Sequence, residues 1–448
     1  MRGREILLLV LIAFLVVLQV APGAERGEDK SYASFRTFVT VFNQVKRNYV
    51  VDVDDEKLFY GAFKGMLAEL DPYSQFLSKE DVEQLEVDTE GEFGGLGIEI
   101  TLDQSRTLTV ITPLEDTPAI QAGVQPGDRI IKIEGESTYN TTLLDAVRKL
   151  RGKPGTKVTI TVLHQFTGKR EEITITRDVI KVHSVRASHI VDEKAKIGYI
   201  RMNNFQRTTA DELDEAVRKL LEKGMRGLVL DLRRNPGGLL DSAVAVSDRF
   251  IDKGLIVSTK GRVADTVHRF DAHKAGTYPD FALAVLVSGF SASGSEIVAG
   301  AIQDHHRGIL VGSRTFGKGS VQSILSLEGG CKLRLTTAHY YTPSGRLIHR
   351  EINAKQDDPW GIFPDIEVKT TYKDELGLSE QFRQQRITES TGKDAPKPEV
   401  KAPEVNAPEA EAPAANGANG EAEEEEYVDK ALVRAVDALK AVLVYRTK

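Results

Sequence analysis

The sequence predicts an α/β fold: a core of mostly parallel strands with crossover helices, a β-rich domain inserted before it, and helical segments at both ends. In the core, the buried strands "KIGYIRM", "GLVLDLR" and "ALAVLVSG" alternate with the helical stretches "TADELDEAVRKLLEKG" and "SEIVAGAIQDHH". From Glu92 to Arg177 the pattern changes to short alternating strands. Near both ends, apolar residues recur at three- and four-residue spacing, which indicates amphipathic helices.

Residues 1–24 have the layout of an export signal. Arg2 and Arg4 precede an apolar run from Ile6 to Val20, and small residues follow up to Ala24. The apolar run is near the lower length limit for a membrane-spanning helix, so an uncleaved N-terminal membrane anchor is the alternative. Either reading predicts an exported protein, periplasmic or otherwise extracytoplasmic.

Changes in the spacing of apolar residues predict the bounds of the next three segments. Residues 25–83 are predicted as a helical region that breaks at Asp71-Pro72 and restarts with Ser78 and Asp81 as an N-cap. Residues 84–178 form the β-rich domain, with two helical pieces, "TPAIQAG" and "TTLLDAVRKLRG". Residues 179–387 form the α/β core.

The remaining chain is predicted as a linker (388–426) and a C-terminal amphipathic helix (427–448). The linker is rich in Pro, Ala and Glu and holds eleven acidic residues against three lysines, so it accounts for the net charge of −7. The rest of the chain is nearly neutral, which argues against a nucleic-acid partner. In the C-terminal helix, one face is predicted to dock on the core or on a second subunit; its residues are Val428, Leu432, Val436 and Leu439.

The stretch "VGSRTFGKGSVQ" comes within one residue of a nucleotide-binding loop. Gly312, Gly317 and Lys318 match the pattern, but Gly319 stands where a Ser or Thr is required. Strands rather than a helix follow, so no helical amides face a phosphate. The sequence therefore predicts no nucleotide and no other cofactor.

A different chemistry is indicated by "LVSGFSASGSEIVAGAIQDH". A strand ends there and a helix begins, so Ser293 sits at a helix N-terminus that favours negative oxygen. Ser291, Ser293 and Ser295 all compete for the plainer role of N-cap. The strand "GILVG" returns Lys318 to the same sheet edge, where a serine and a lysine together form a nucleophile-and-base pair.

Other catalytic and metal sites are disfavoured. Asp304, His305 and His306 end the helix that starts at Ser293, about 15 Å away, so they do not form a triad with this serine. Adjacent histidines point apart, and no metal site is predicted. Cys331, the only cysteine, enters an alternating strand and is predicted to be a packed thiol.

The motifs "SASGSEIVAGAIQDH", "VGSRTFGKGSVQ", "DLRRNPGGLL" and "TPAIQAGVQPGDRIIKIEG" resemble the carboxy-terminal processing peptidases, tail-specific serine proteases with an embedded PDZ domain. The resemblance runs from about Arg36 to Asp365. It implies Ser293 as nucleophile, Lys318 as base and Gln322 as a third site residue. Gly294 stands where alanine is usual, but only its backbone amide is needed.

The resemblance implies further roles in the same region. The oxyanion hole would combine the Gly294 amide with that of Gly237 or Gly238. Lys318 must be neutral to act as a base, which predicts a desolvated lysine without a salt bridge.

For the PDZ domain, the resemblance implies that an apolar C-terminal tail docks as an added strand. The residues expected to bind it are Gly95, Leu96, Gly97, Ile98 and Val147. Expected partners are exported proteins with exposed apolar C-termini, a second copy of the chain and a protein that delivers substrates. The alternative function is a catalytically silent PDZ adaptor.

Overall fold

The structure, a computed structural model, describes residues 30–391 and 427–446, apart from 104, 115, 166, 264–266, 352 and 356. The expected export signal and nearly all of the acidic linker lie outside these residues. The chain divides into two compact units between Phe76 and Leu77. Within the described ranges, no helix has both the length and the apolar character needed to cross a membrane.

The first unit contains α2 (Lys30–Asn48) and α3 (Asp55–Ala68), in agreement with the helical periodicity. Asp54 begins α3 by accepting a hydrogen bond from the Glu56 backbone N at 2.9 Å. Stacked rings hold the unit together, with the Phe42 and Phe59 centroids 4.7 Å apart. The chain enters the second unit within the short strand β1 (Gln75–Leu77).

Helix α4 (Lys79–Glu90) opens the second unit with the cap that the sequence predicts. Ser78 Oγ accepts from the Asp81 N at 3.3 Å, and the Asp81 carboxylate accepts from the Ser78 N at 3.1 Å. The helix runs past the predicted domain boundary at residues 83–84, because the capping signal starts a helix that ends only at Gly91.

The predicted β-rich domain is present, and its strands form an antiparallel sheet. In their hydrogen-bonded order its strands are β3 (Ile98–Leu102), β4 (Leu108–Pro113), β5 (Arg129–Ile133), β7 (Lys157–Leu163) and β8 (Arg170–Thr176). The strand β6 (Glu136–Ser137) pairs with β5, while β2 (Glu92–Gly95) pairs with β9 (Asp178–Lys181). Two helices, α5 (Pro118–Gln121) and α6 (Leu143–Leu150), complete the domain. Strand β3 is an edge strand, which leaves one side for an added strand.

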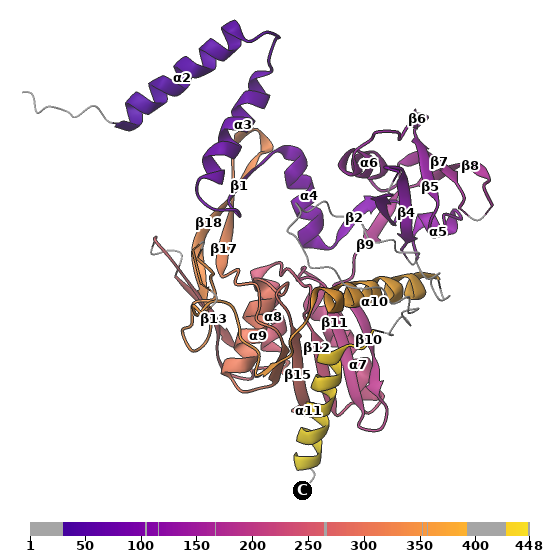
Figure 1. Ribbon diagram of the computed structural model, residues 1–448, viewed down its shortest axis with the longest axis vertical. Helices are drawn as coiled ribbons and strands as arrows, with labels where there is room; N and C mark the ends of the chain where they lie inside the picture. Colours follow the sequence, from indigo (N-terminus) through magenta and orange to yellow (C-terminus); the bar gives the residue numbers. More distant parts are fainter. Residues whose placement is uncertain are drawn as a thin grey trace, which may run out of the picture. The chain divides into compact units, whose positions relative to one another are not determined.

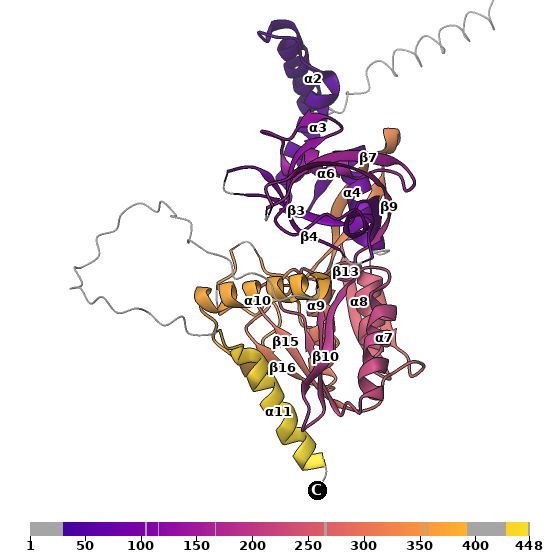
Figure 2. The same cartoon turned by 90° about the vertical axis from the view of Figure 1, so that its right-hand side faces the viewer.

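The α/β core is built on a six-stranded sheet that is parallel except for its first pair. Its strands, in order, are β10 (Val185–Asp192), β11 (Ile197–Met202), β12 (Gly227–Asp231), β15 (Ala282–Val287), β16 (Ile309–Gly312) and β19 (Ile366–Glu367). The sheet is covered on one face by α7 (Thr209–Glu222), α8 (Leu240–Asp248) and α9 (Gly294–Asp304), and on the other by α11 (Lys430–Arg446) (Figures 1 and 2). Successive residues of a strand point to opposite faces of the sheet. In β12, Leu228 and Leu230 pack toward α7–α9, whereas Val229 packs toward α11.

A second, antiparallel sheet lies beside the first. It pairs β13 (Gly254–Gly261) with β14 (His268–Ala272) and with β18 (Lys332–Tyr341), and β18 with β17 (Ser320–Ser326). The turn between β17 and β18 includes the short 3-10 helix η2 (Glu328–Gly330). Cys331 follows this turn and is buried, as a packed thiol should be.

The helix α10 (Tyr372–Thr391) continues through the predicted start of the linker at residue 388. Beyond the linker, α11 packs on the sheet of its own chain, but the predicted apolar face is partly wrong. Val428 precedes the helix and is 59% exposed. Two alanines, Ala431 and Ala435, are buried in the contact as well, and their small side chains let the helix approach the strands closely. The buried residues are Ala431, Ala435, Val436, Leu439 and Leu443.

Leu439 is fully buried in this contact, so its truncation tests how much α11 stabilises the core. Leu439→Ala is expected to lower the free energy of unfolding by about 3 kcal/mol, through lost transfer energy and a residual cavity. Urea unfolding monitored by circular dichroism would measure the change. Val433→Ala, on the exposed side of the same helix, is the control. Equal stability of the two variants would contradict a stabilising role for this contact.

Candidate active site

Ser293 lies where β15 leads into α9, and its backbone has φ 54° and ψ −110°. Positive φ is costly for a residue with a Cβ, and such strain is concentrated at functional sites. The neighbouring serines have structural bonds: Ser291 Oγ donates to Leu232 O at 2.8 Å and Ser295 Oγ to Asn235 O at 2.9 Å. Of the three competing serines, Ser293 is therefore the one with the strained backbone at the helix N-terminus.

Lys318 reaches the same place from the loop after β16. Burial lowers the pKa of its amine, and the positive charge of Arg334 lowers it further. The predicted desolvation is therefore correct. The charge of Glu296 acts on the amine in the opposite direction and raises its pKa, but less than burial lowers it, and the expected lack of a salt bridge stays a prediction.

Glu296 connects the two segments and was not singled out from the sequence. Its carboxylate is fully buried. Oε2 accepts from the backbone N of Ser293 and from that of Lys318, each at 2.8 Å. Oε1 accepts from Gly317 N at 2.7 Å and from Thr315 Oγ1 at 2.6 Å. The two backbones are therefore anchored on a single oxygen atom.

The environment of Glu296 is unusual for an acidic side chain. Burial raises the pKa of its carboxyl group to about 7, although the four hydrogen bonds act in the opposite direction. The available sequence signal was an acidic residue in the otherwise small and apolar stretch "SASGSEIVAGA". The bond to the Ser293 N follows the S-x-x-E spacing of a capping box, whereas the three partners in residues 315–318 lie too far along the chain to be inferred from helical spacing.

Gln322 lies on β17, where its Nε2 donates to Ser320 Oγ at 2.9 Å and to Thr336 Oγ1 at 3.4 Å. A contact between Gln322 and Lys318 stays a prediction. Gly317 has φ 87°, a conformation that favours glycine.

Tyr340 is a second residue that the sequence did not reveal. The residue is 5% exposed, and its backbone N donates to Gly319 O at 2.7 Å. Burial raises the pKa of the phenol to about 12, while a hydrogen bond with the Ser293 side chain lowers it. The phenol therefore stands beside the candidate nucleophile.

The loop "NPGG" lies directly against Ser293. A Cβ built on Gly237 would approach Ser293 Cβ to 2.8 Å, so only glycine fits. The Gly237 amide already donates to Asn235 Oδ1 at 2.9 Å. By contrast, the amides of Gly238 and Gly294 donate to no acceptor in the part of the chain that the structure describes. The sequence left open whether Gly237 or Gly238 supplies the second amide of the oxyanion hole, and this difference favours Gly238.

The candidate tail-binding loop precedes the edge strand β3. Gly97 has φ 77°, and a Cβ there would lie 2.3 Å from Thr117 Cβ. The carbonyls of Leu96 and Gly97 accept from Ala119 N and Leu114 N, whereas their amides have no acceptor among the described residues. Gly95 ends β2, Ile98 begins β3, and the half-buried Val147 lies on α6.

Comparisons with known proteins bear on this arrangement. Residues 196–368 match the model of peptidase family S41, residues 109–163 match a PDZ domain, and residues 18–81 match the N-terminal domain of the activating protease CtpB. A carboxy-terminal-processing protease of Bartonella bacilliformis is 41% identical over 373 residues, which cover 82% of this chain and 83% of that protein. The chain belongs to peptidase family S41.

Two further proteins resemble this S41 peptidase. A probable CtpA-like serine protease of Staphylococcus aureus is 34% identical over 366 residues, covering 81% of this chain and 70% of that protein. The solved structure of a photosystem II D1 C-terminal processing protease is 28% identical, covers 74% of this chain and 92% of its own, and has a TM-score of 0.42. The family match, the PDZ match and the two curated relatives show that the chain is a serine-type peptidase of the carboxy-terminal processing kind, with a PDZ domain.

His305 and His306 of this S41 peptidase lie at the end of α9 away from Ser293, as predicted. The helix α9 starts beside Ser293 and ends at Asp304, and His305 is its C-cap. His305 Nε2 lies 2.7 Å from Leu255 O. Among the described residues, no group of three His, Cys, Asp or Glu side chains could hold a metal ion.

Proposed function

We propose that this peptidase cleaves exported proteins with a Ser–Lys pair, in which Ser293 is the nucleophile and Lys318 the general base. The observation that carries the proposal is the shared Glu296 oxygen, which holds the two backbones together. The lowered pKa of Lys318 also supports it, because a base must be neutral when it takes a proton. A silent PDZ adaptor would need neither feature.

In the proposed reaction, Ser293 Oγ attacks the scissile carbonyl carbon while Lys318 Nζ takes the hydroxyl proton. The negative oxygen that forms on the carbonyl accepts hydrogen bonds from the amides of Gly294 and Gly238. We assign Gly238 rather than Gly237, because the Gly237 amide is bonded to Asn235.

The intermediate then collapses. The C–N bond breaks, and Lys318 gives its proton to the leaving amine, which leaves an acyl group on Ser293. In the second half, Lys318 takes a proton from water, and the resulting hydroxide attacks the ester. Collapse releases the carboxylic acid product, and Ser293 recovers its proton from Lys318. No cofactor takes part.

Gln322 and Tyr340 would support this reaction from β17 and β18. The Tyr340 phenol, which is hydrogen-bonded to the Ser293 side chain, can hold the Ser293 hydroxyl in one orientation before attack. Gln322 is proposed to orient the lysine side chain, since it lies on β17, the strand that directly follows the Lys318 loop.

The substrate's apolar C-terminus is proposed to add as a strand along β3, facing α6, with its carboxylate on the free amides of Leu96 and Gly97. Val147 on α6 would contact the last side chain. Residues 1–24 have the sequence of an export signal, so the substrates would be exported proteins.

Tail selectivity tests this proposal. An unfolded reporter protein ending in apolar residues is expected to be cleaved with a lower KM than the same reporter ending in two aspartates. Val147→Glu should raise the KM for the apolar tail about tenfold with kcat unchanged, because it places a charge where the last side chain binds. Steady-state cleavage assays would measure both constants.

The matched control for this test is Arg148→Glu, which also adds a negative charge to α6 at an exposed position. It should leave the preference for the apolar tail intact, and Ser293→Ala provides the uncleaving reference. If wild type, Val147→Glu and Arg148→Glu gave the same KM for both reporters, the proposed tail recognition would be wrong.

A further inference from the structure

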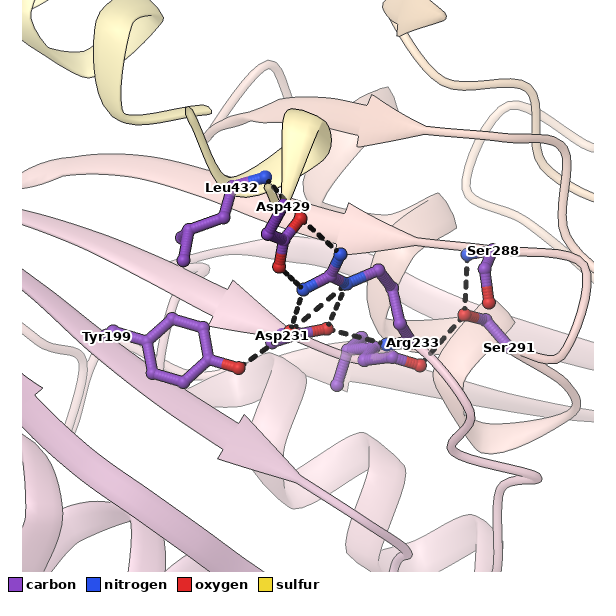
Figure 3. A network of polar contacts seen from close by, with 8 residues as sticks. Tyr199, Asp231, Arg233, Ser288, Ser291, Asp429 and Leu432 are labelled. Carbon is purple, nitrogen blue, oxygen red and sulfur yellow. Dashed lines mark hydrogen bonds and ion pairs between the residues drawn. The ribbon is translucent and has the colours of Figure 1, made fainter. Parts of the chain in front are cut away.

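A buried ion cluster lies beside the loop that follows β12, and none of its members acts in the reaction proposed above. Its centre is Arg233, whose side chain is 5% exposed. Asp231 and Asp429 flank the guanidinium, and Tyr199 donates its hydroxyl hydrogen to Asp231 at 2.8 Å (Figure 3). Asp429 is separated from Arg233 by 196 positions and comes from the segment that leads into α11.

The Arg233 guanidinium donates to both carboxylates. Nη1 and Nη2 donate to the two oxygens of Asp429 at 2.8 and 2.7 Å, which is the two-pronged geometry of strong arginine–carboxylate pairs. Nε and Nη2 donate to Asp231 at 3.0 and 2.7 Å. Removing one partner of such a buried pair leaves charge without full compensation and is strongly unfavourable.

The backbone on either side of Arg233 holds the turn that carries the nucleophile. Leu232 O accepts from Ser291 Oγ at 2.8 Å, and Asn235 O accepts from Ala292 N at 3.0 Å. Ser291 and Ala292 are the two residues directly before the nucleophile. The position of the Arg233 loop therefore bears directly on the position of the reacting hydroxyl.

The other end of the cluster is fixed by α11. Asp429 Oδ1 also accepts from the Leu432 backbone N at 3.0 Å, so the carboxylate that pairs with Arg233 caps the first turn of the helix. Lys430 pairs with Asp374 of α10 at 3.0 Å on the surface. The docked helix and the active-site loop thus meet at a single carboxylate.

We propose that Asp429 is a positioning residue of the peptidase site, which fixes Arg233 and thereby holds the Leu232–Gly238 loop against Ser293. This inference rests on the proposed role of Ser293. The C-terminal helix is then part of the working enzyme, although Asp429 touches no reacting atom. Loss of its carboxylate lets the loop relax, which lowers turnover without changing the tail-binding groove along β3.

The test compares full-length variants in steady-state cleavage assays. Asp429→Asn is expected to lower kcat about tenfold with KM unchanged, which is within the range of network mutations that act at a distance. Asp429→Glu keeps the charge on a longer side chain and should give a kcat between those of wild type and Asp429→Asn. Asp437→Asn, an exposed acid on the same helix, should behave as wild type. So should Lys430→Ala, which breaks only the surface pair.

Three results would overturn the inference. The first is wild-type kcat in Asp429→Asn. The second is an equal loss of kcat in Asp429→Asn and Lys430→Ala, with both variants unfolding at lower urea concentrations than wild type. Weaker docking of α11 would then be enough to explain the loss of kcat. The third applies if Asp429→Asn does not fold: it is a folded Asp429→Glu variant with wild-type kcat. Activity in Ser293→Ala would instead refute the proposed function itself.

Discussion

Replacing Ser293 or Lys318 by alanine is expected to lower kcat/KM by about 10⁴-fold, and replacing both is expected to lower it no further. The two side chains act in one step: without the base the hydroxyl keeps its proton, and without the hydroxyl the amine has no proton to take. Rates of cleavage of a fluorogenic peptide by the two single variants and the double variant would measure this. Additive losses would mean that the residues act separately.

The pH dependence provides a second test of the same pair. Because Lys318 acts as a neutral amine, kcat/KM should rise with pH through the pKa of Lys318. The midpoint should lie below the usual lysine value of about 10.4, since burial and Arg334 lower this pKa. Arg334→Gln removes a positive charge and should move the midpoint to higher pH. A midpoint that does not respond to Arg334 would assign the titration to another group.

The sequence predicted the location of Ser293 and Lys318 because both stand where parallel strands end, and those ends meet at one edge of a sheet. The α/β core and the β-rich domain followed from periodicity alone. The predicted catalytic roles of these residues came from the motifs and stay predictions. The strand order determines where the backbone lies, but not which side chain gives or takes a proton.

Other parts of the site could not be predicted from local patterns. Glu296 gains three of its four partners from a loop more than fifteen positions away, and Asp429 meets Arg233 across 196 positions. Neither contact leaves a periodic signal in the chain. The buried face of α11 was predicted only in part for a related reason: Val436 and Leu439 are buried as expected, but Ala431 and Ala435 were missed because alanine carries little weight in an apolar pattern.

Glu296→Gln is expected to lower kcat about 100-fold, although the side chain keeps its size. All four groups that contact the carboxylate are donors: the backbone N of Ser293, Gly317 and Lys318, and Thr315 Oγ1. In either orientation, glutamine turns its own NH₂ donor toward two of them. Two hydrogen bonds to a charged acceptor are lost, each worth about 1.5–3 kcal/mol, and the Ser293 and Lys318 backbones are no longer anchored together.

The stability of Glu296→Gln should depend on pH differently from that of wild type. The pKa of Glu296 in the folded state is raised from 4.5 to about 7, so its favourable contribution is fully present below pH 4.5 and is lost as the pH rises toward 7. The difference in unfolding free energy between wild type and Glu296→Gln should therefore fall by about 3 kcal/mol over this range. Urea unfolding at several pH values would measure it.

Glu212→Gln is the matched control for Glu296→Gln, because the Glu212 carboxylate also accepts from two backbone amides, Ser184 N and Val185 N. It should cost stability but leave kcat unchanged, since neither amide belongs to the site. In Glu296→Gln, any residual activity should also have its alkaline midpoint at lower pH, because the charge that raised the pKa of Lys318 is gone. Equal kcat losses in the two variants would show that Glu296 only stabilises the fold, whereas a loss confined to Glu296→Gln, with a shifted midpoint, would show that its carboxylate aligns the nucleophile with its base.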